Sequence, residues 1–538
     1  MKRTRFAVSI AVCLVVAVCF SAAARKHLSP GMRPASPAGQ TADNPTAVPY
    51  FPNVFSADVV VSNTDRNLKN TDVFFNSEPG ITINPTNPLN IVISSFSGAW
   101  SQLNHGSYQN APLWYSQTGG LLWTKEFSIP SPTGLTGNRI ETSPCDETFD
   151  FDRNGVLYGT FLLDGRGEEG ANCSSGDESA AEEQPADVGI VSGATSNPAS
   201  ALSWQWLVLN GQVQYTNQQV PSDQPWLIVN QDPLNPAQDN VYVAYQSQAM
   251  QVAVAQAEIP PDFTIDHSPG PVTNPGWNPA HRIAADHTSG AIYSLWETAA
   301  SIPCPAGGDP IRYNLNRSTD GGVTWGLNGS ATGMAAAEAC SHQNVITYAF
   351  GEPEPGTILG GVNPLRGGID ALAVDPRTGD VYVVFGEYDA SVNRDRIAIV
   401  ELTKQADGSL QVGTSHYVSG TDYQSALPAI AVADNAAGTV AVLYDTADGL
   451  DDAGSRPYFS VHLAVSQDHG NTFQTVLLQK FLFPENAPRG GAGPRPLGDY
   501  QQLKSLGSTF YGVFAGDGQP FGRPFHKIDP IFIKTSVR

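Results

Sequence analysis

The sequence predicts an all-β fold built from one repeated unit of four short strands. Glycine occurs 52 times and proline 41 times, and short apolar runs alternate with turn residues along most of the chain. An eight-residue turn pattern occurs at 318–325 and again at 466–473, and a related pattern occurs at 116–123. Recurrence of one kind of turn indicates a repeated supersecondary unit.

The first residues, 1–24, have the organisation of a secretory signal peptide. Three basic residues precede the apolar run 6–20, and the small residues 22–24 suit cleavage. The apolar run is short for a membrane span and no later run is long enough, so we expect a secreted chain without a membrane span; a retained anchor is the alternative. Residues 25–54 are rich in Pro, Ala, Ser and Gly, which predicts a flexible leader before a folded domain at 55–538.

A strand–turn–strand pattern repeats seven times in that domain. A strand ends in Asp, Asn or Leu, a short turn follows, and a β-branched or aromatic strand returns. The pairs are 80–84 with 90–94, 148–152 with 156–158, 226–230 with 240–245, 282–286 with 291–296, 371–375 with 381–385, 429–434 with 440–444, and 502–506 with 509–514. Each unit has room for two further strands, except the last, which the spare run 58–61 would complete. The prediction is a single seven-bladed β-propeller of four-stranded blades, closed by an N-terminal strand in the last blade; six blades is the alternative.

The recurring turn has a physical explanation. Its defining residues are Ser318, Asp320, Gly322 and Trp325 in one copy and Ser466, Asp468, Gly470 and Phe473 in the other. The Asp accepts backbone N–H bonds within its own turn, Gly supplies a positive φ, and the aromatic residue packs under the hairpin. The copy at 116–123 has Thr118 in place of the Asp.

This Ser-x-Asp-x-Gly-x-Thr-Trp pattern resembles the Asp-box, or BNR repeat, of the sialidase superfamily. The stretches 77–88 and 497–501 also resemble exported bacterial sialidase-like proteins, so the resemblance covers 55–538. It implies a propeller that acts on or binds extracellular glycans, as a sialidase-like exo-glycosidase. The alternative is a non-catalytic scaffold or protein-binding module. In the family the Asp-box is structural and lies on the face away from the active site.

Sialidases also carry an Arg-Ile-Pro motif, and this chain has none. Its nearest stretches are Arg139-Ile140-Glu141 and Arg282-Ile283-Ala284. The formal net charge of −22 disfavours nucleic acid and anionic membranes as partners. The expected partner is therefore an extracellular glycan or protein, bound by a monomer.

Four cysteines follow the signal segment: Cys145, Cys173, Cys304 and Cys340. In an exported protein they indicate two disulfides more than a metal site, and no metal-binding spacing is present. Strand alternation places all four on one face of the predicted ring, which suits the pairs Cys145–Cys173 and Cys304–Cys340. Each bridge would hold a long loop on that face.

Acidic residues gather on the same face, at the predicted mouth of the central channel. Glycosidases use two carboxyl groups across a sugar, and sialidases replace the nucleophile with tyrosine. The candidate catalytic residues are Asp146, Glu147, Asp499 and Tyr500. The candidate substrate-binding residues are Arg282, Glu78, Asp223 and Asp370, with Arg282 as an anion anchor. The alternative is that these carboxylates cap turns or hold channel water and a cation.

No cofactor is expected to be required. The acidic run 164–187 has the oxygen ligands that Ca²⁺ prefers, but it lacks the regular spacing of a calcium loop. A solvated charge run is the alternative, and the one that such composition favours.

Overall fold

The computed structural model describes residues 53–71, 76–96, 112–128, 143–164, 188–200, 203–208, 223–246, 250–270, 281–305, 309–341, 370–435, 437–451, 456–483, 489–490, 493–494, 497–498 and 500–537. Regular structure in these ranges is almost entirely strand. The helical turns are α2 (Leu68–Thr71) and η7 (Gln519–Phe521). Within the described residues, no helix is long and apolar enough to cross a membrane.

Seven antiparallel sheets of four strands confirm the predicted seven-bladed propeller. Blade 1 is β2 (Ser77–Ile83), β3 (Ile91–Phe96), β4 (Pro112–Ser116) and β5 (Thr124–Ser128); blade 2 is β6 (Ser143–Phe151), β7 (Leu157–Asp164), β8 (Val188–Thr195) and β9 (Gln205–Val208). Blade 3 is β10 (Asp223–Gln231), β11 (Asp239–Gln246), β12 (Met250–Gln256) and β13 (Phe263–His267); blade 4 is β14 (Arg282–Ala285), β15 (Ile292–Ala299), β16 (Asp309–Ser318) and β17 (Met334–Ser341).

The remaining blades have the same order. Blade 5 is β18 (Asp370–Val374), β19 (Val381–Asp389), β20 (Arg394–Lys404) and β21 (Leu410–Tyr417); blade 6 is β22 (Gln424–Val432), β23 (Val440–Leu450), β24 (Pro457–Ser466) and β25 (Gln474–Leu482). Blade 7 is β28 (Gln502–Leu506), β29 (Thr509–Asp517), β30 (Ile528–Ser536) and β1 (Phe55–Asp58). A two-stranded ribbon, β26 (Arg489–Gly490) with β27 (Gly493–Pro494), precedes β28.

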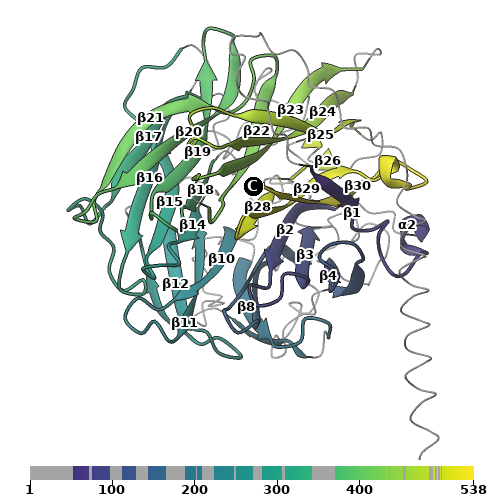
Figure 1. Cartoon of the computed structure of the whole chain (residues 1–538), viewed down its shortest axis with the longest axis horizontal. Coiled ribbons are helices and arrows are strands. Elements are labelled where there is room, and N and C mark those ends of the chain that lie inside the picture. Colours follow the sequence, from purple (N-terminus) through teal and green to yellow (C-terminus); the bar gives the residue numbers. More distant parts are fainter. Residues whose placement is uncertain are drawn as a thin grey trace, which may run out of the picture. The chain divides into compact units, whose positions relative to one another are not determined.

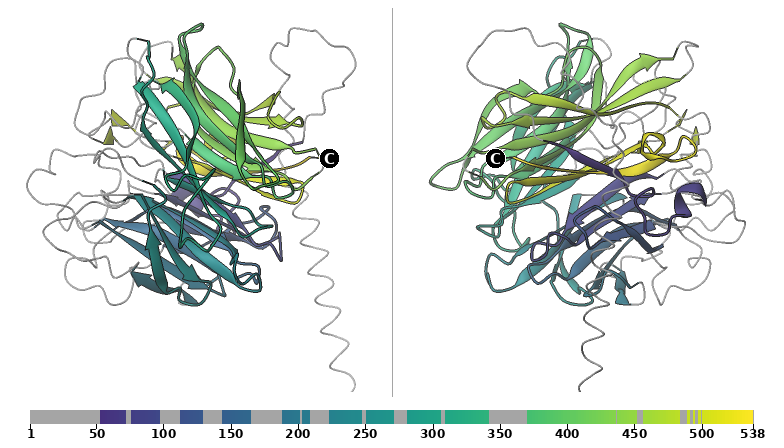
Figure 2. Two further views of the ribbon diagram at one scale, coloured as in Figure 1. Left: turned by 90° about the vertical axis from the view of Figure 1, so that its left-hand side faces the viewer. Right: turned by 45° about the vertical axis from the view of Figure 1, so that its right-hand side comes forward.

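The first strand of each blade lies innermost. Each innermost strand packs against those of both neighbouring blades, and β28 packs against β2, so the ring of sheets is closed (Figure 1). Figure 2 shows the twist of the same sheets from two further directions. Twisted sheets that pack face to face leave a central channel lined by the innermost strands.

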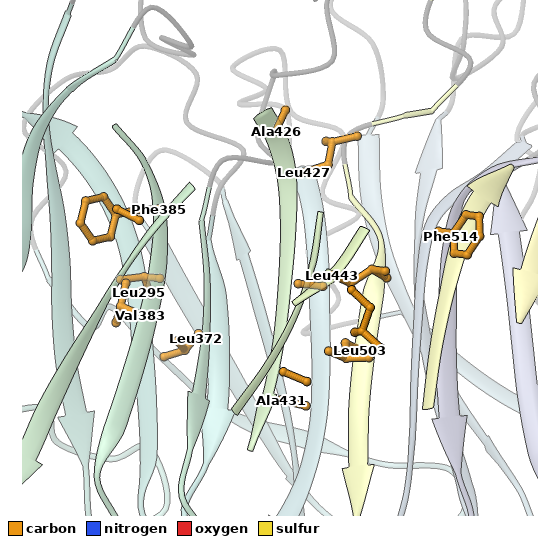
Figure 3. Close-up of a cluster of buried hydrophobic side chains, with 14 of the residues drawn as sticks. Leu295, Leu372, Val383, Phe385, Ala426, Leu427, Ala431, Leu443, Leu503 and Phe514 are labelled. Atoms are coloured by element: carbon orange, nitrogen blue, oxygen red, sulfur yellow. The ribbon is translucent and has the colours of Figure 1, made fainter. Parts of the chain in front are cut away.

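Large side chains fill the spaces between neighbouring blades. The most extensive cluster spans blades 4 to 7 and includes Leu295, Phe385, Leu443 and Phe514, all fully or almost fully buried (Figure 3). Alternation along a strand sends successive side chains to opposite faces of the sheet. Each blade therefore contributes to two interblade cores, which is why both faces of the second strands are apolar.

An N-terminal strand closes the ring, as predicted, but its position differs from the predicted run 58–61. The strand is Phe55–Asp58, with Ala57 opposite Phe532 of β30. Asp58 ends it, because one oxygen of its carboxylate accepts hydrogen bonds from the backbone N–H groups of Val60 (2.7 Å) and Val61 (3.0 Å). The apolar residues after Asp58 therefore form a buried turn instead of the strand that their β-branched side chains indicated.

The innermost strands run from the face that we call upper to the face that we call lower. The recurring turns connect third to fourth strands, and register places them on the lower face: Ser466 pairs with Val440, and Val440 pairs with Val432 at the end of β22. In the 318–325 turn, the Ser318 hydroxyl donates to Asp320 (2.9 Å), and Asp320 accepts from the backbone N–H of Thr324 (2.9 Å). The 466–473 turn repeats these bonds.

Candidate functional site

The upper ends of four innermost strands carry a register shift, which separates Ser77 from Gly80, Cys145 from Thr148, Asp223 from Trp226, and Ala426 from Ala429. In three of these bulges a non-glycine residue adopts a positive φ angle: Glu78 (49°), Asp146 (52°) and Leu427 (54°). A non-glycine residue in this region costs on the order of 1–2 kcal/mol, and such strain clusters at functional sites. Two of the three residues are acidic, at the mouth of the channel.

Five carboxyl groups are buried at this upper end of the channel. Glu78, Asp146 and Glu147 come from blades 1 and 2, whereas Glu297 and Asp370 come from blades 4 and 5; none is more than 8% exposed. Burial raises the pKa of Glu147 well above its usual value, and the neighbouring carboxylates of Asp146 and Glu78 raise it further. Burial and these neighbours therefore favour the neutral, protonated form of the Glu147 carboxyl over its charged form.

Three side chains meet across the channel axis beside these carboxyl groups. The guanidinium of Arg282 (blade 4) lies 4.4 Å from the ring centre of Trp226 (blade 3) and 5.9 Å from that of Tyr500 (blade 7). The Trp226 and Tyr500 rings are themselves in edge-on contact, 5.5 Å apart. The negative faces of aromatic rings attract a cation and help to hold it in place. Residues from blades on opposite sides of the ring thus form one cluster.

The environments of Glu147 and Asp370 differ. Burial raises the pKa of Asp370 to about 7, and the positive charge of Arg282 works in the opposite direction. Burial also raises the pKa of Glu297 well above its usual value, with Asp370 adding to this and Arg282 opposing it. Asp370 therefore ionises near neutral pH, with Arg282 favouring its charged form. The charged neighbours that act on Glu147 are carboxylates, which favour its protonated form. Two carboxyl groups in such different surroundings suit the acid and base roles of acid–base chemistry.

These upper-face carboxyl groups differ from the acids of the lower face. Asp286 accepts hydrogen bonds from the backbone N–H and hydroxyl of Thr288 (3.0 and 2.6 Å) and pairs with Lys404 (3.0 Å). By contrast, no described residue hydrogen-bonds to the carboxyl oxygens of Glu147 or Asp370, or to the hydroxyl of Tyr500, although all are buried. The lower acids cap turns. Glu147 and Asp370 on the upper face therefore do not cap turns, because no described backbone N–H group donates to their carboxyl oxygens.

Below the Trp226–Arg282–Tyr500 contact, the channel encloses a cavity of about 580 Å³. Arg282, Asp370 and Tyr500 form part of its upper wall, and its lower wall includes Arg153 and Lys504. The space is large enough for a sugar residue and its water shell.

The structure brings together six of the eight residues that were predicted to form the site. These are Glu78, Asp146, Glu147, Arg282, Asp370 and Tyr500. Asp223 begins β10, but its side chain lies outside the described part of the structure, as does the whole of Asp499. Sequence reasoning missed Trp226 and Glu297. Both occur within strand-like runs, where an aromatic residue and an alternating polar residue are ordinary, so nothing local distinguished them.

One predicted disulfide is present. Cys304 and Cys340 are bonded, with Cα atoms 5.6 Å apart, and they join the loop between β15 and β16 to the end of β17 on the upper face. The predicted Cys145–Cys173 bond and the acidic run 164–187 lie outside the described residues. Within the described ranges, no three His, Cys, Asp or Glu side chains converge closely enough to hold a metal ion.

Comparison with known proteins yields only distant similarities. No protein-family model matches the chain, and no curated protein sequence matches it. Among solved structures, a Dyadobacter fermentans protein of unknown function aligns with a TM-score of 0.41 and 11% identity, covering 91% of this chain and 100% of that one. An intramolecular trans-sialidase from Ruminococcus gnavus gives 0.35 and 11%, covering 90% and 97%.

An α-L-arabinofuranosidase from Fusarium graminearum aligns with a TM-score of 0.38 and 9% identity, covering 73% of this chain and 92% of that one. At such TM-scores and identities these similarities carry no argument about activity. The propeller fold is established by the seven sheets of this chain, and the function has to be argued from the residues of its own site.

Proposed function

We propose that the upper-face cluster hydrolyses glycosidic bonds in neutral sugars. The observation that carries the proposal is that two buried carboxyl groups at the upper end of the channel, Glu147 of blade 2 and Asp370 of blade 5, have oxygens that receive no hydrogen bond from any described residue. Asp370 also lines the cavity. A buried polar group without a partner is costly, typically about 1–3 kcal/mol, and needs a reason. A substrate that supplies the missing hydrogen bonds is such a reason.

The roles follow from the two environments. Glu147, whose protonated form is favoured by burial and by its carboxylate neighbours, donates its proton to the glycosidic oxygen as the bond to the anomeric carbon breaks. Asp370, ionised with the help of Arg282, attacks the anomeric carbon or takes a proton from the water that does. Burial and the carboxylates of Asp146, Glu78 and Glu147 raise the pKa of Tyr500 well above its usual value, so its phenol stays protonated and donates a hydrogen bond.

The balance of charge favours a neutral sugar. The only guanidinium among the described residues of the cluster, that of Arg282, already neighbours Asp370, Asp146 and Glu297, so no cation is left over for a substrate carboxylate there. A sialoside carries its own carboxylate, which would be repelled here. An anion anchor was the role expected for Arg282 from the sequence; its surroundings favour the role of a counter-ion to Asp370.

A panel of fluorogenic aryl glycosides tests this function. We expect the purified full-length chain to release the fluorophore from at least one neutral glycoside among arabinofuranosides, galactosides, xylosides and glucosides, and not from the N-acetylneuraminic acid glycoside. Release only from the sialoside would contradict the proposed substrate class. Binding on a glycan array without release from any glycoside would show that the propeller is a binding module.

The pH dependence of the reaction tests the role of Asp370. We expect kcat/KM to rise about tenfold per pH unit up to a pH of about 7, where Asp370 becomes ionised, and to fall again at higher pH, once Glu147 loses the proton that it donates. Because Arg282 lowers the pKa of Asp370, the Arg282→Met variant should move this rise to higher pH. A rise that stays at the same pH in the variant would show that another group controls it.

A further inference from the structure

A second cavity lies on the lower side of the ring, between blades 5 and 6. It encloses about 280 Å³, and its polar lining is Glu401, Thr414, His416, His469 and Asn471, with Ile399 as an apolar wall. Glu401 and Ile399 belong to β20, Thr414 and His416 to β21, and His469 and Asn471 to the 466–473 turn of blade 6. We call this cavity the blade 5–6 pocket.

His469 occupies a backbone position where its counterparts are glycines. Its φ is 60°, and the fourth residue of the other two turns, Gly321 and Gly119, has φ of 75° and 67°. Glycine adopts this conformation without steric cost, whereas a residue with a Cβ does not. A histidine at this position is therefore unfavourable for the turn itself. Its side chain needs a role that offsets the strain.

The same chain provides two blade junctions for comparison, because the 116–123, 318–325 and 466–473 turns each pack against the preceding blade. Strand register makes three pairs equivalent: Tyr382 with Glu401 in blade 5, Tyr511 with Lys534 in blade 7, and Asn240 with Gln256 in blade 3. At the junction of blades 7 and 1, Phe532 contacts Trp123 with ring centres 5.4 Å apart, and Lys534 lies 5.1 Å from the Tyr511 ring. That space is filled by large side chains.

Smaller residues stand at the junction of blades 5 and 6. Ile399 occupies the position that Phe532 has in blade 7. Ile399 packs against Gly470, the fifth residue of the 466–473 turn, and Phe532 packs against Gly120, the fifth residue of the 116–123 turn. Phe473 takes the place of Trp123 at the end of the turn. Compared with the junction of blades 7 and 1, the cavity therefore lies beside two smaller side chains.

The polar side chains of the blade 5–6 pocket are held in one arrangement. The Tyr382 hydroxyl donates to a carboxylate oxygen of Glu401 (2.7 Å) and lies 3.2 Å from Nδ1 of His469. Burial, and then the hydrogen bond to Glu401, raise the pKa of Tyr382, so the phenol keeps its proton for that bond. The Tyr382 oxygen therefore remains as an acceptor for an Nδ1–H of His469.

The position of the imidazole is fixed on its other side as well. A Cβ added at Gly438 would lie 2.4 Å from the His469 ring, so the ring rests directly on the backbone of the first hairpin of blade 6. With Nδ1 engaged and one face covered, the ring has little rotational freedom. Pre-arranged groups lose little entropy when a ligand binds.

From this geometry we propose that the blade 5–6 pocket binds a single neutral sugar residue. A carboxylate, imidazole nitrogens, a hydroxyl and a side-chain amide offer both acceptors and donors to sugar hydroxyls, and Ile399 offers an apolar wall to the C–H face of a ring. The net charge of −22 disfavours an anionic ligand. The described His and acidic side chains do not converge as metal ligands. The site lies apart from the upper-face cluster and does not depend on catalysis there.

Saturation-transfer difference NMR with methyl glycosides of galactose, glucose, mannose, xylose and arabinose tests the proposal. The protein is the full-length Glu147→Gln/Tyr500→Phe variant, in which the upper-face cluster is altered. We expect at least one methyl glycoside to give a saturation signal, and we expect His469→Gly or Glu401→Ala in the same background to reduce that signal at least fivefold. Gln256→Ala, at the equivalent position of blade 3, is the matched control and should leave it unchanged.

Thermal unfolding separates binding from folding. Because His469→Gly restores the residue that the other turns use, its melting temperature should equal or exceed that of the parent. The proposal is overturned if no methyl glycoside binds, or if His469→Gly and Glu401→Ala bind as the parent does. It is equally overturned if Gln256→Ala loses as much signal as Glu401→Ala. Failure of the upper-face hydrolysis would leave these measurements unaffected, so the two proposals are tested separately.

Discussion

Replacing Glu147 with glutamine is expected to lower kcat for glycoside hydrolysis by about 10²–10⁴-fold, because the amide has no proton to give to the leaving oxygen. The same change should leave the free energy of unfolding equal or higher. The Glu147 carboxyl is fully buried, no described residue hydrogen-bonds to it, and Asp146 and Glu78 disfavour its charge. A neutral isostere keeps the shape and removes that conflict. Initial rates with the best aryl glycoside and denaturant unfolding give the two quantities.

The matched control is Asp286→Asn on the lower face. Asp286 is held by Thr288, Ser289 and Lys404, which together bring its pKa down to about 2 although burial acts to raise it. Its ionised form therefore stabilises the fold, and we expect the amide to cost about 1–3 kcal/mol of unfolding free energy while kcat stays within about twofold. If Glu147→Gln instead lost stability and kept its activity, Glu147 would be a structural residue and the proposed acid would be wrong.

The strand pattern was sufficient to predict the seven sheets because each blade repeats the same local sequence–structure relation. For example, the runs 371–375 and 381–385 are rich in apolar residues and are joined by a short turn. The structure has strands β18 and β19 at these positions. The closing strand was misplaced by three residues for a local reason. Val59 and Val60 have strong β propensity, but two hydrogen bonds decide their conformation. The backbone N–H of Val60 donates to the Asp58 carboxylate, and that of Val59 donates to the backbone oxygen of Pro530 in β30.

The functional cluster was only partly predictable, because it depends on which blades face each other. The position of acidic residues at the starts of innermost strands indicated the upper mouth, and Glu78, Asp146, Glu147 and Asp370 do lie there. The contact of Trp226 with Tyr500 joins blades 3 and 7, and no local pattern encodes a contact across the ring. The strained backbone of Glu78 and Asp146 was equally invisible, since neither residue is the glycine that usually marks a positive φ.

The largest effect on stability is expected from Arg523, in the last blade. Its guanidinium lies 2.8 Å from the Asp529 carboxylate, both side chains are fully buried, and it donates to the backbone oxygen of Lys69 (3.0 Å) near the N-terminal closing strand. Asp58, which ends that strand, is buried beside them: burial raises its pKa to about 6, and Asp529 and Arg523 work against the rise. One cation thus compensates two buried carboxyl groups that connect the N-terminal strand to blade 7.

Arg523→Met should therefore lower the free energy of unfolding by about 3–5 kcal/mol at pH 8, because it leaves two carboxyl groups buried without their cation. Arg312→Met is the control: its ion pair with Glu338 (3.2 Å) involves side chains that are 41% and 35% exposed, and such pairs contribute less than about 1 kcal/mol.

The folded pKa of Asp58 lies above its usual 3.8, so its proton stabilises the fold below about pH 4 and this contribution is lost as pH rises through 6. Arg523 lowers the pKa of Asp58, so without Arg523 the Asp58 carboxyl binds its proton more tightly, and the loss in Arg523→Met should be smaller at pH 5 than at pH 8. Equal losses at both pH values, or equal losses in both variants, would mean that packing of the arginine stem, and not its charge, holds the ring closed.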